Sequence, residues 1–443
     1  MGQEGGGYAL RPGRGVTPSR LSALPPIRLD PLRPFRGAVA SVYVHAPFCA
    51  RRCFYCDFAV QVRGRGGSGE WLEALAGELK ALEREARFRL REPLATLYVG
   101  GGTPSLLGPD AMEGLARLLG PSRVGDPGIE WTAEANPESF TPELAGAWRR
   151  AGVNRISLGV QTFSEEALRW MGRLHGAPGA EEAVATARNM GFDSVSFDLI
   201  FGLPGGLSRS WEEDLIRAVD LGVPHVSLYG LTVEPDTPLG RAVREGREGA
   251  VDEDRYREEY LQAVEILVGA GFEHYEVSNF ARPGHASRHN HAYWGGGAYL
   301  GLGNSAHSYA HPLRRWNLRG WGEYQSMALR ATLPVAGQEI LGPGEHRLER
   351  VWLGLRTSRG MAIGGLTEPA FECVRSWERR GLARIADGAV KLRAAGWLLL
   401  DRLTVELDGA LPTREPGTPS LDAARAPRRC STGTEGAPHI RES

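Results

Sequence analysis

Hydrophobic positions along this chain follow two alternating periodicities. Some segments have apolar residues at steps of three and four, as Leu72, Leu75 and Leu79 do within residues 70–88, and residues 252–271 repeat this helical spacing. Between such segments lie short β-rich runs, at positions 42–46, 96–100, 130–136, 155–162, 194–201 and 225–232. Six strand–helix units in about 190 residues predict a parallel sheet with crossover helices. The fold class is therefore α/β, either an open sheet or, since six units are short of a full eight-unit barrel, a partial (β/α)6 barrel.

The segments beyond the sixth strand predict a second, smaller unit. A further strand-like run covers residues 274–280, and the glycine-rich segment 295–303 indicates a turn with close packing. From residue 342 the pattern changes, because 350–355 and 368–380 are helical while 383–385, 389–392 and 394–401 combine short strands with a helix. These proportions predict a small α+β domain of the winged-helix type after the barrel.

Both ends of the chain lack a sustained apolar period. Residues 1–38 are rich in Gly, Pro and Arg, and residues 412–443 look similar, so neither segment can bury enough apolar surface to offset chain entropy. We therefore predict a disordered extension over 1–38, a core barrel over 39–310, a C-terminal domain over 311–411 and a disordered tail over 412–443.

Composition narrows the class of protein. The 443 residues include 52 basic and 53 acidic side chains, and a net charge of -1 gives no argument for nucleic-acid binding, which needs a basic face. No apolar run approaches the roughly 20 residues that span a bilayer, and the N-terminus lacks the apolar core of a secretory signal. Five cysteines are too few for a disulfide framework, which favours a reducing location. Together these features favour a cytoplasmic protein with no membrane span.

The first predicted strand is followed at once by three cysteines at C-x3-C-x2-C spacing: Cys49, Cys53 and Cys56. Three thiolates in so short a loop can converge on one cuboidal four-iron cluster, which needs one ligand for each iron. Because Cys373 and Cys430 lie far along the chain, one iron would keep an open position for a small molecule. A zinc site with His45 as its fourth ligand, or three unligated thiols, are the alternatives.

Polar residues and glycines collect where the predicted strands end. The turn Gly100-Gly-Gly-Thr-Pro104 follows the second strand, and its glycines would let the backbone approach a ligand closely. The third, fourth and fifth strands carry Glu134, Gln161 and Asp198 near their carboxyl ends. One such residue commonly ties down a loop, but three at the same rim of a barrel predict a ligand site.

The segment YVHAPFCARRCFYCDF, residues 43–58, resembles the cluster loop of the radical S-adenosylmethionine (SAM) superfamily. It is most similar to the oxygen-independent coproporphyrinogen III oxidase-like family, which includes the HemW-type heme chaperones, and the resemblance covers roughly residues 40–408. The resemblance implies a 4Fe-4S cluster on Cys49, Cys53 and Cys56, SAM on the open iron and an electron donor to the cluster. It also implies SAM contacts at Tyr43, Tyr55, Gly101, Gly102, Thr103, Glu134, Gln161, Arg173 and Asp198.

Three features favour the heme-chaperone branch of this family. The oxidases carry a further cysteine where this chain has Phe58, and they have a longer ordered N-terminal segment. The sequence HNHAYW at residues 289–294 fits the HNxxYW motif of the chaperones. That motif implies heme as a ligand, His289 as its axial ligand and heme-acceptor proteins as partners, although histidines in aromatic loops also commonly hydrogen-bond to neighbouring groups.

The expected function is therefore that of a heme chaperone that carries a cluster and exchangeable SAM. An oxygen-independent coproporphyrinogen III oxidase is the alternative, and it would make product with SAM and a reductant under anaerobic conditions. A third possibility is a zinc- or cluster-binding module without radical chemistry, and zinc without acid-labile sulfide would identify the zinc form.

Overall fold

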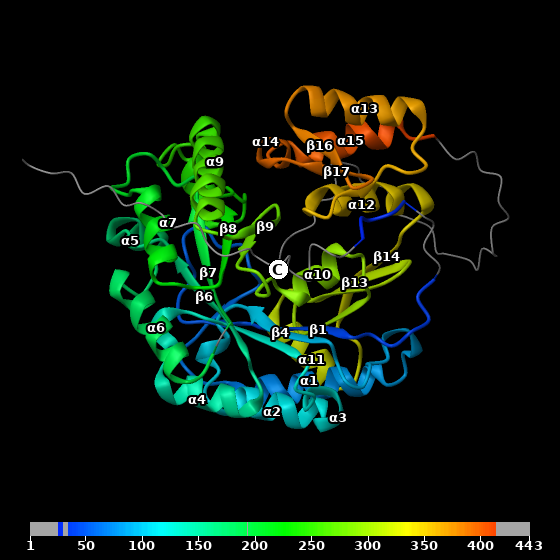
Figure 1. Ribbon diagram of the computed structural model, residues 1–443. Helices are drawn as coiled ribbons and strands as arrows, with labels where there is room; N and C mark the ends of the chain where they lie inside the picture. Colours follow the sequence, from blue (N-terminus) through cyan, green and yellow to red (C-terminus); the bar gives the residue numbers. More distant parts are fainter. Residues whose placement is uncertain (1–24, 30–33, 193, 413–443) are drawn as a thin grey trace, which may run out of the picture.

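The computed structural model describes residues 25–29, 34–192 and 194–412. Its core is a twelve-stranded sheet in the order β14-β13-β12-β11-β1-β4-β5-β6-β7-β8-β10-β9 (Figure 1). The parallel centre consists of the six predicted strands: β1 Ser41–Ala46, β4 Thr96–Gly101, β5 Glu130–Ala135, β6 Arg155–Gln161, β7 Ser194–Phe201 and β8 His225–Gly230. The predicted α/β fold with a large parallel sheet is thus confirmed.

Helices follow the parallel strands and pack on the sheet (Figure 1). The predicted apolar stripe of residues 70–88 forms α1, which buries Trp71 and Leu75 but ends at Leu82, while a separate 3-10 turn follows at Ala86–Phe88. The helices of this layer are α1 Ser68–Leu82, α2 Asp110–Leu119, α3 Pro121–Val124, α4 Pro142–Ala151, α5 Glu165–Met171, α6 Ala177–Asn189, α7 Trp211–Asp220, α8 Pro238–Arg244 and α9 Glu253–Gly269.

The sheet extends beyond the six strands at both edges. The predicted strand over 274–280 is a hairpin of β9 Glu273–Glu276 and β10 Asn279–Ala281, which pairs antiparallel with β8. On the other side, β11 Tyr299–Leu302 pairs parallel with β1. An antiparallel run then continues through β12 His307–Ala310, β13 Leu313–Asn317 and β14 Val335–Ile340, with α11 Trp321–Ala328 between the last two.

The prediction of a turn over 295–303 was therefore wrong for its second half, which is a strand inside the sheet. Its glycines serve close packing, since a Cβ added at Gly301 would lie 2.1 Å from the carbonyl oxygen of His307 on β12. The predicted division between residues 310 and 311 falls in the β12–β13 hairpin, so both sides of it belong to one sheet.

A small α+β module follows the sheet and lies against it in Figure 1. It contains α12 Pro343–Arg356, β15 Met361–Ala362, α13 Glu368–Arg379, β16 Ala383–Ala386, β17 Ala389–Leu392, α14 Ala394–Trp397 and α15 Leu400–Ala410. Its three strands form a separate sheet in the order β15-β17-β16. The helix α10 Arg288–Trp294 lies between this module and the large sheet, and it contacts both β4 and α12.

The segment expected to be a disordered extension is partly ordered. Ile27 is buried, forms a β-bridge with Met361 and exchanges backbone hydrogen bonds with Gly360 and Ala362. Burial of one apolar side chain with two backbone hydrogen bonds was not visible in the Gly- and Pro-rich composition. The predictions for residues 1–24, 30–33 and 413–443, and for Cys430, lie outside the described residues.

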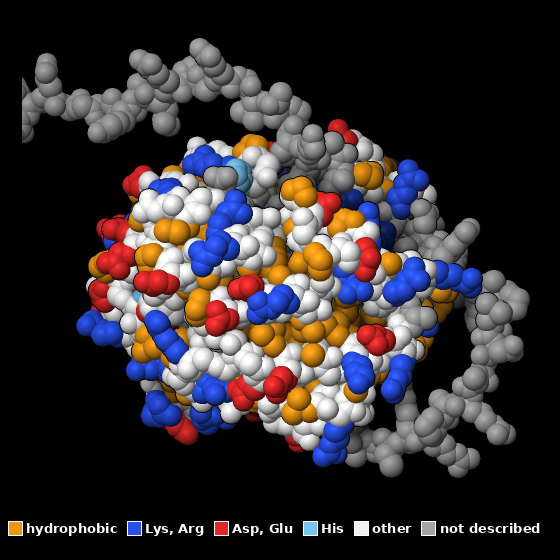
Figure 2. Space-filling model, turned by 90° about the horizontal axis from the view of Figure 1, so that it is seen from below, with side chains coloured by type: hydrophobic (Ala, Val, Ile, Leu, Met, Phe, Trp, Pro, Cys, Tyr) orange, Lys and Arg blue, Asp and Glu red, His pale blue; other side chains and the backbone are white. Residues whose placement is uncertain are grey.

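The surface of the described residues carries mixed charge. Figure 2 shows basic and acidic side chains interspersed around a band of apolar side chains on one face of the molecule. Among the helices of the described ranges, none is both long and apolar enough to cross a membrane.

Candidate functional site

The three cysteines of the predicted cluster loop lie immediately beyond β1. Cys49 belongs to the short strand β2 Phe48–Cys49, which pairs with β3 Gln61–Val62, and all three thiols are half-buried and free. Thr103 Oγ1 donates a hydrogen bond to Cys49 Sγ at 3.4 Å, and Arg173 Nη1 lies 3.8 Å from Cys53 Sγ. Donors aimed at sulfur favour thiolates, so this set of side chains fits iron ligation.

A single-metal site of the zinc type finds no support in the described part of the chain. No three His, Cys, Asp or Glu side chains there converge on one ion. The two ring nitrogens of His45, the fourth ligand in the zinc alternative, lie 3.1 Å from the Tyr43 hydroxyl and 3.1 Å from the Ala59 carbonyl oxygen. A cluster can space its thiolates more widely than one ion does, because each sulfur binds a different iron.

The glycine turn after β4 packs directly on the cluster loop. The amide nitrogens of Gly102 and Thr103 donate to the carbonyl oxygens of Ala46 and Phe48 at 2.7 Å and 2.8 Å. Gly101 has a φ of 107°, and a Cβ there would lie 2.3 Å from the His45 ring. Only glycine therefore lets this turn approach the loop so closely.

Glu134, at the end of β5, is held beside this turn. Its carboxylate accepts hydrogen bonds from the Tyr98 hydroxyl at 2.7 Å and from the Gly101 amide at 3.0 Å. Tyr43, on β1, stacks on Tyr98 with ring centroids 6.0 Å apart. Burial raises the pKa of Glu134, although both hydrogen bonds oppose the shift. The hydrogen bonds from Tyr98 and Gly101 do not use all of the lone pairs of the Glu134 carboxylate, so it can also accept from a cationic or hydroxyl-bearing ligand.

Asp198 on β7 is the second carboxylate of the site. Ser157 Oγ, on the neighbouring strand β6, lies 3.1 Å and 3.2 Å from its two oxygens. Burial, and then the charge of Glu134, raise the pKa of Asp198 to about 7. Two buried carboxylates with raised pKa values at one rim, one of them raised in part by the charge of the other, form a site suited to hydrogen-bond donors or a positive charge.

Arg173, Asn136 and Gln161 converge around Gly159. A Cβ added at Gly159 would lie 3.0 Å from Gln161 Nε2, 3.1 Å from Asn136 Oδ1 and 3.2 Å from Arg173 Nη2. Arg173 Nη2 donates to Asn136 Oδ1 and to the Gly159 carbonyl oxygen, both at 2.7 Å. Asn136 Nδ2 donates in turn to Thr103 Oγ1 at 3.3 Å. A continuous path of hydrogen bonds therefore joins Cys49 to Cys53 through Thr103 after β4, Asn136 after β5 and Arg173 after α5.

Tyr55 lies within the cluster loop, next to Arg173. Burial raises the pKa of the Tyr55 hydroxyl, and the positive charge of Arg173 opposes that shift. The phenol is therefore neutral and can donate or accept a hydrogen bond at the mouth of the site.

His289, the expected axial ligand of heme, is buried behind the carboxylate Glu134. Its ring is 1% exposed, Nδ1 lies 2.8 Å from Thr96 Oγ1, and Nε2 lies 2.8 Å from the Tyr293 hydroxyl. Burial lowers the pKa of His289 to about 3, so the ring is neutral. The ring also stacks on Tyr98 with centroids 5.2 Å apart, and Tyr98 holds Glu134. Both ring nitrogens of His289 therefore have hydrogen-bond partners in this structure, and its expected axial role stays a prediction.

The structure thus brings all of the SAM-contact candidates into one region and adds two residues. Asn136 and Tyr98 were not singled out from the sequence, yet each bonds directly to a candidate, Asn136 to Arg173 and Tyr98 to Glu134. Position gave a signal for Asn136, since it follows Glu134 at a strand end before Pro137. Tyr98 sits inside a strand, where an aromatic side chain usually indicates packing.

Comparison with known proteins agrees with this site. Residues 43–218 match the radical SAM superfamily, and this span contains every SAM-contact candidate. The fold is similar to that of coproporphyrinogen III oxidase (HemN) from Escherichia coli, a radical SAM enzyme, with a TM-score of 0.69. The two are 22% identical, and the match covers 86% of this chain and 92% of that one. Residues 43–218 therefore belong to a radical SAM domain.

Curated relatives identify the family within that superfamily. Heme chaperone HemW of Mycobacterium tuberculosis is 39% identical over 393 residues, which are 87% of this chain and 98% of that protein. Heme chaperone HemW of Bacillus subtilis is 32% identical over 371 residues, covering 81% and 96%. The chain belongs to the HemW family of heme chaperones.

Proposed function

We propose that this chain binds a 4Fe-4S cluster on Cys49, Cys53 and Cys56, binds SAM exchangeably at the adjoining strand ends, and transfers heme to acceptor proteins. The observation that carries the cofactor part is the hydrogen-bond path from Cys49 through Thr103, Asn136 and Arg173 to Cys53. The names of the HemW relatives support the heme part.

Each side chain at the site has a chemical role in this proposal. When bound, the cluster supplies one iron with an open position and a one-electron redox centre. Arg173 and Thr103 donate toward the sulfurs and offset thiolate charge, and Arg173 also suits a carboxylate. Glu134 and Asp198 suit the ammonium and ribose hydroxyls of SAM, with Gln161 and the backbone of Gly101 and Gly102 beside them. An external electron donor and a location in the cytoplasm stay part of the proposal.

A heme titration tests the chaperone function. Hemin is added anaerobically to cluster-reconstituted protein and the Soret band is followed, and a heme-free hemoprotein is then added as acceptor. We expect saturation near one heme per chain and loss of that heme to the acceptor. Absence of saturable binding, together with decarboxylation of coproporphyrinogen in the presence of SAM and a reductant, would instead identify an oxidase.

A separate titration tests the SAM site. Replacing Glu134 by Gln keeps the shape of the side chain but removes its charge, so SAM should bind at least about tenfold more weakly, a loss of ~1.4 kcal/mol. Cluster absorbance should stay unchanged, because Glu134 is hydrogen-bonded to Tyr98 and Gly101 and to none of the three thiols. Loss of the cluster in Glu134→Gln would show that Glu134 is structural.

A further inference from the structure

Gln161 has a backbone conformation that a residue with a side chain rarely adopts. Its φ is 70°, in the left-handed region, although it is 9% exposed at the end of a strand. The pairing of β6 with β7 shifts register between Leu158 and Gln161, as at a β-bulge. Such strain persists only where the surroundings enforce it, and it gathers at functional sites.

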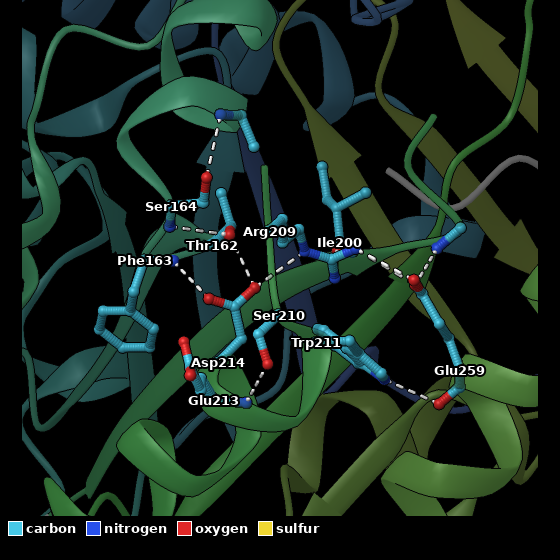
Figure 3. Close-up of polar contacts among 12 residues, drawn as sticks. Thr162, Phe163, Ser164, Ile200, Arg209, Ser210, Trp211, Glu213, Asp214 and Glu259 are labelled. Carbon is cyan, nitrogen blue, oxygen red and sulfur yellow. Dashed lines mark hydrogen bonds and ion pairs between the residues drawn. The ribbon is translucent and has the colours of Figure 1, made fainter. Parts of the chain in front are cut away.

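The backbone on both sides of Gln161 is held by buried side chains. On the amino-terminal side, His175 Nε2 lies 3.1 Å from the Val160 carbonyl oxygen. On the carboxyl-terminal side, the carboxylate of Asp214 accepts hydrogen bonds from Thr162 Oγ1 at 2.7 Å and from the Phe163 amide at 2.8 Å (Figure 3). No hydrogen bond among the described residues holds the amide group of Gln161 itself, which extends toward Gly159 and Arg173.

Asp214 is held in turn by Arg209, as Figure 3 shows. Arg209 Nε donates to Asp214 Oδ2 at 2.9 Å, and Nη2 donates to the carbonyl oxygen of Ile200 near the end of β7 at 3.0 Å. Arg209 Nη1 also lies 3.2 Å from Glu259 Oε2, which accepts a hydrogen bond from the Gly202 amide at 2.7 Å. The Arg209–Asp214–Glu259 network therefore ties the loop after Gln161 to the end of the strand that carries Asp198.

This network has no obvious value for stability alone. The side chains of Arg209, Asp214 and Glu259 are 4%, 3% and 8% exposed, and Arg255 Nε adds a second positive charge 3.0 Å from Glu259 Oε1. Two positive and two negative side chains balance, but removing buried ions from water offsets much of their attraction, and well-packed apolar residues often serve equally well. What apolar residues could not do is hold Thr162 and Phe163 by directed hydrogen bonds.

We propose that Asp214, held by Arg209, is a positioning residue that keeps Gln161 in its left-handed conformation and so presents the Gln161 amide to the nucleoside part of bound SAM. This inference rests on the proposed SAM site. It assigns a role to two residues that lie outside the strand-end candidates and touch no cofactor ligand.

The test compares Asp214→Asn with Asp220→Asn, the same change at an exposed position on the same helix. Full-length, cluster-reconstituted protein is used, and amide hydrogen exchange is read for residues 160–164 without SAM. In Asp214→Asn we expect at least about tenfold faster exchange of the Phe163 amide and about tenfold weaker SAM binding, with unchanged cluster absorbance. Asp220→Asn should change neither, and exchange as slow in Asp214→Asn as in the parent would overturn the proposal.

A second comparison separates positioning from simple structural support. Glycine adopts a φ of 70° without strain, so a Gln161→Gly background removes the need for enforcement. If Asp214 enforces the conformation, Asp214→Asn should lower the melting temperature by less than half as much in that background as in the parent. Equal losses in both backgrounds would refute the proposal.

The proposal can still be tested if Asp214→Asn does not fold or if the parent protein does not bind SAM. Should Asp214→Asn not fold, Thr162→Val removes the hydroxyl that donates to Asp214 and accepts from the Ser164 amide, and it should still speed exchange at Phe163 and weaken SAM binding. If the parent protein itself does not bind SAM, the proposed function fails, while exchange and the Gln161→Gly comparison still decide whether Asp214 holds the conformation.

Discussion

Asp198 gives the sharpest quantitative prediction, because its raised pKa makes stability depend on pH. In the unfolded chain the carboxyl has an ordinary pKa near about 4, whereas in the folded protein burial and Glu134 raise the pKa to about 7. Between these values the folded state holds a proton that the unfolded state has lost. The contribution of Asp198 to the free energy of unfolding is therefore fully present below about pH 4. It is lost as the pH rises through the folded pKa.

Replacing Asp198 by Asn removes this titration and keeps the shape of the side chain. From pH 5 to the folded pKa of about 7 is about two pH units, equivalent to about 3 kcal/mol of stability lost by the parent. The side chain of Asp198 is only partly buried, so solvent screening reduces this to roughly half. Relative to the parent, Asp198→Asn should thus gain roughly 1–3 kcal/mol on going from pH 5 to pH 8. The same variant should bind SAM more weakly at pH 8.

The assay is thermal unfolding of protein without cofactors at pH 5, 6, 7 and 8, with Asp220→Asn as the matched surface control. The difference in melting temperature between Asp198→Asn and the parent should grow with pH and level off above 7, where the parent is fully ionised. Adding Glu134→Gln to the parent should move this transition to lower pH, because one cause of the shift is removed. A difference that stays constant from pH 5 to pH 8 would refute the reasoning.

Three further predictions concern the cluster loop, the glycine turn and the motif helix. Cys49→Ala should abolish the brown cluster absorbance at about 400 nm, since two thiolates cannot hold four irons. Cys373→Ala, on the distant helix α13, should retain that absorbance. An intact cluster in Cys49→Ala would contradict the ligand set. Gly101→Ala should lower the free energy of unfolding, measured by denaturant titration, by about 2–4 kcal/mol, because the added Cβ would meet the His45 ring and the φ would be strained. An unchanged free energy of unfolding would show that the turn can move. His289→Phe should lower the melting temperature of heme-free protein, because it breaks two buried hydrogen bonds. Unchanged stability together with lost heme binding would instead support His289 as the iron ligand.

The six parallel strands could be predicted from sequence because both of their faces are buried. Continuous β-rich runs such as residues 155–162 leave no ambiguity, and all seven residues of β6 are buried. β11 lacks that signal, since two of the residues around its end are glycines that permit close contact with His307 and His45. A glycine needed for close approach looks the same in sequence as a glycine in a turn.

Site residues could be predicted where residue type alone limits the chemistry. Three thiols in one loop, or a carboxylate inside an apolar strand, have few explanations. His289 shows the opposite case, because an imidazole can ligate iron or hydrogen-bond to Thr96 and Tyr293, and only the structure shows both nitrogens occupied. The role of Asp214 could not be predicted either, since it depends on a backbone angle at a residue 53 positions earlier in the chain.

The position of β1 in the sheet has a consequence for synthesis of the protein. This strand precedes the cysteine loop and pairs on one side with β4 but on the other with β11, so that Ser41 is opposite Tyr299 and Val44 is opposite Leu302. A ribosome must therefore extrude about 260 further residues before the second edge of β1 is covered. Iron delivered to a nascent chain would meet an incompletely supported loop. Cluster insertion is thus best suited to the released polypeptide, after its final third has folded.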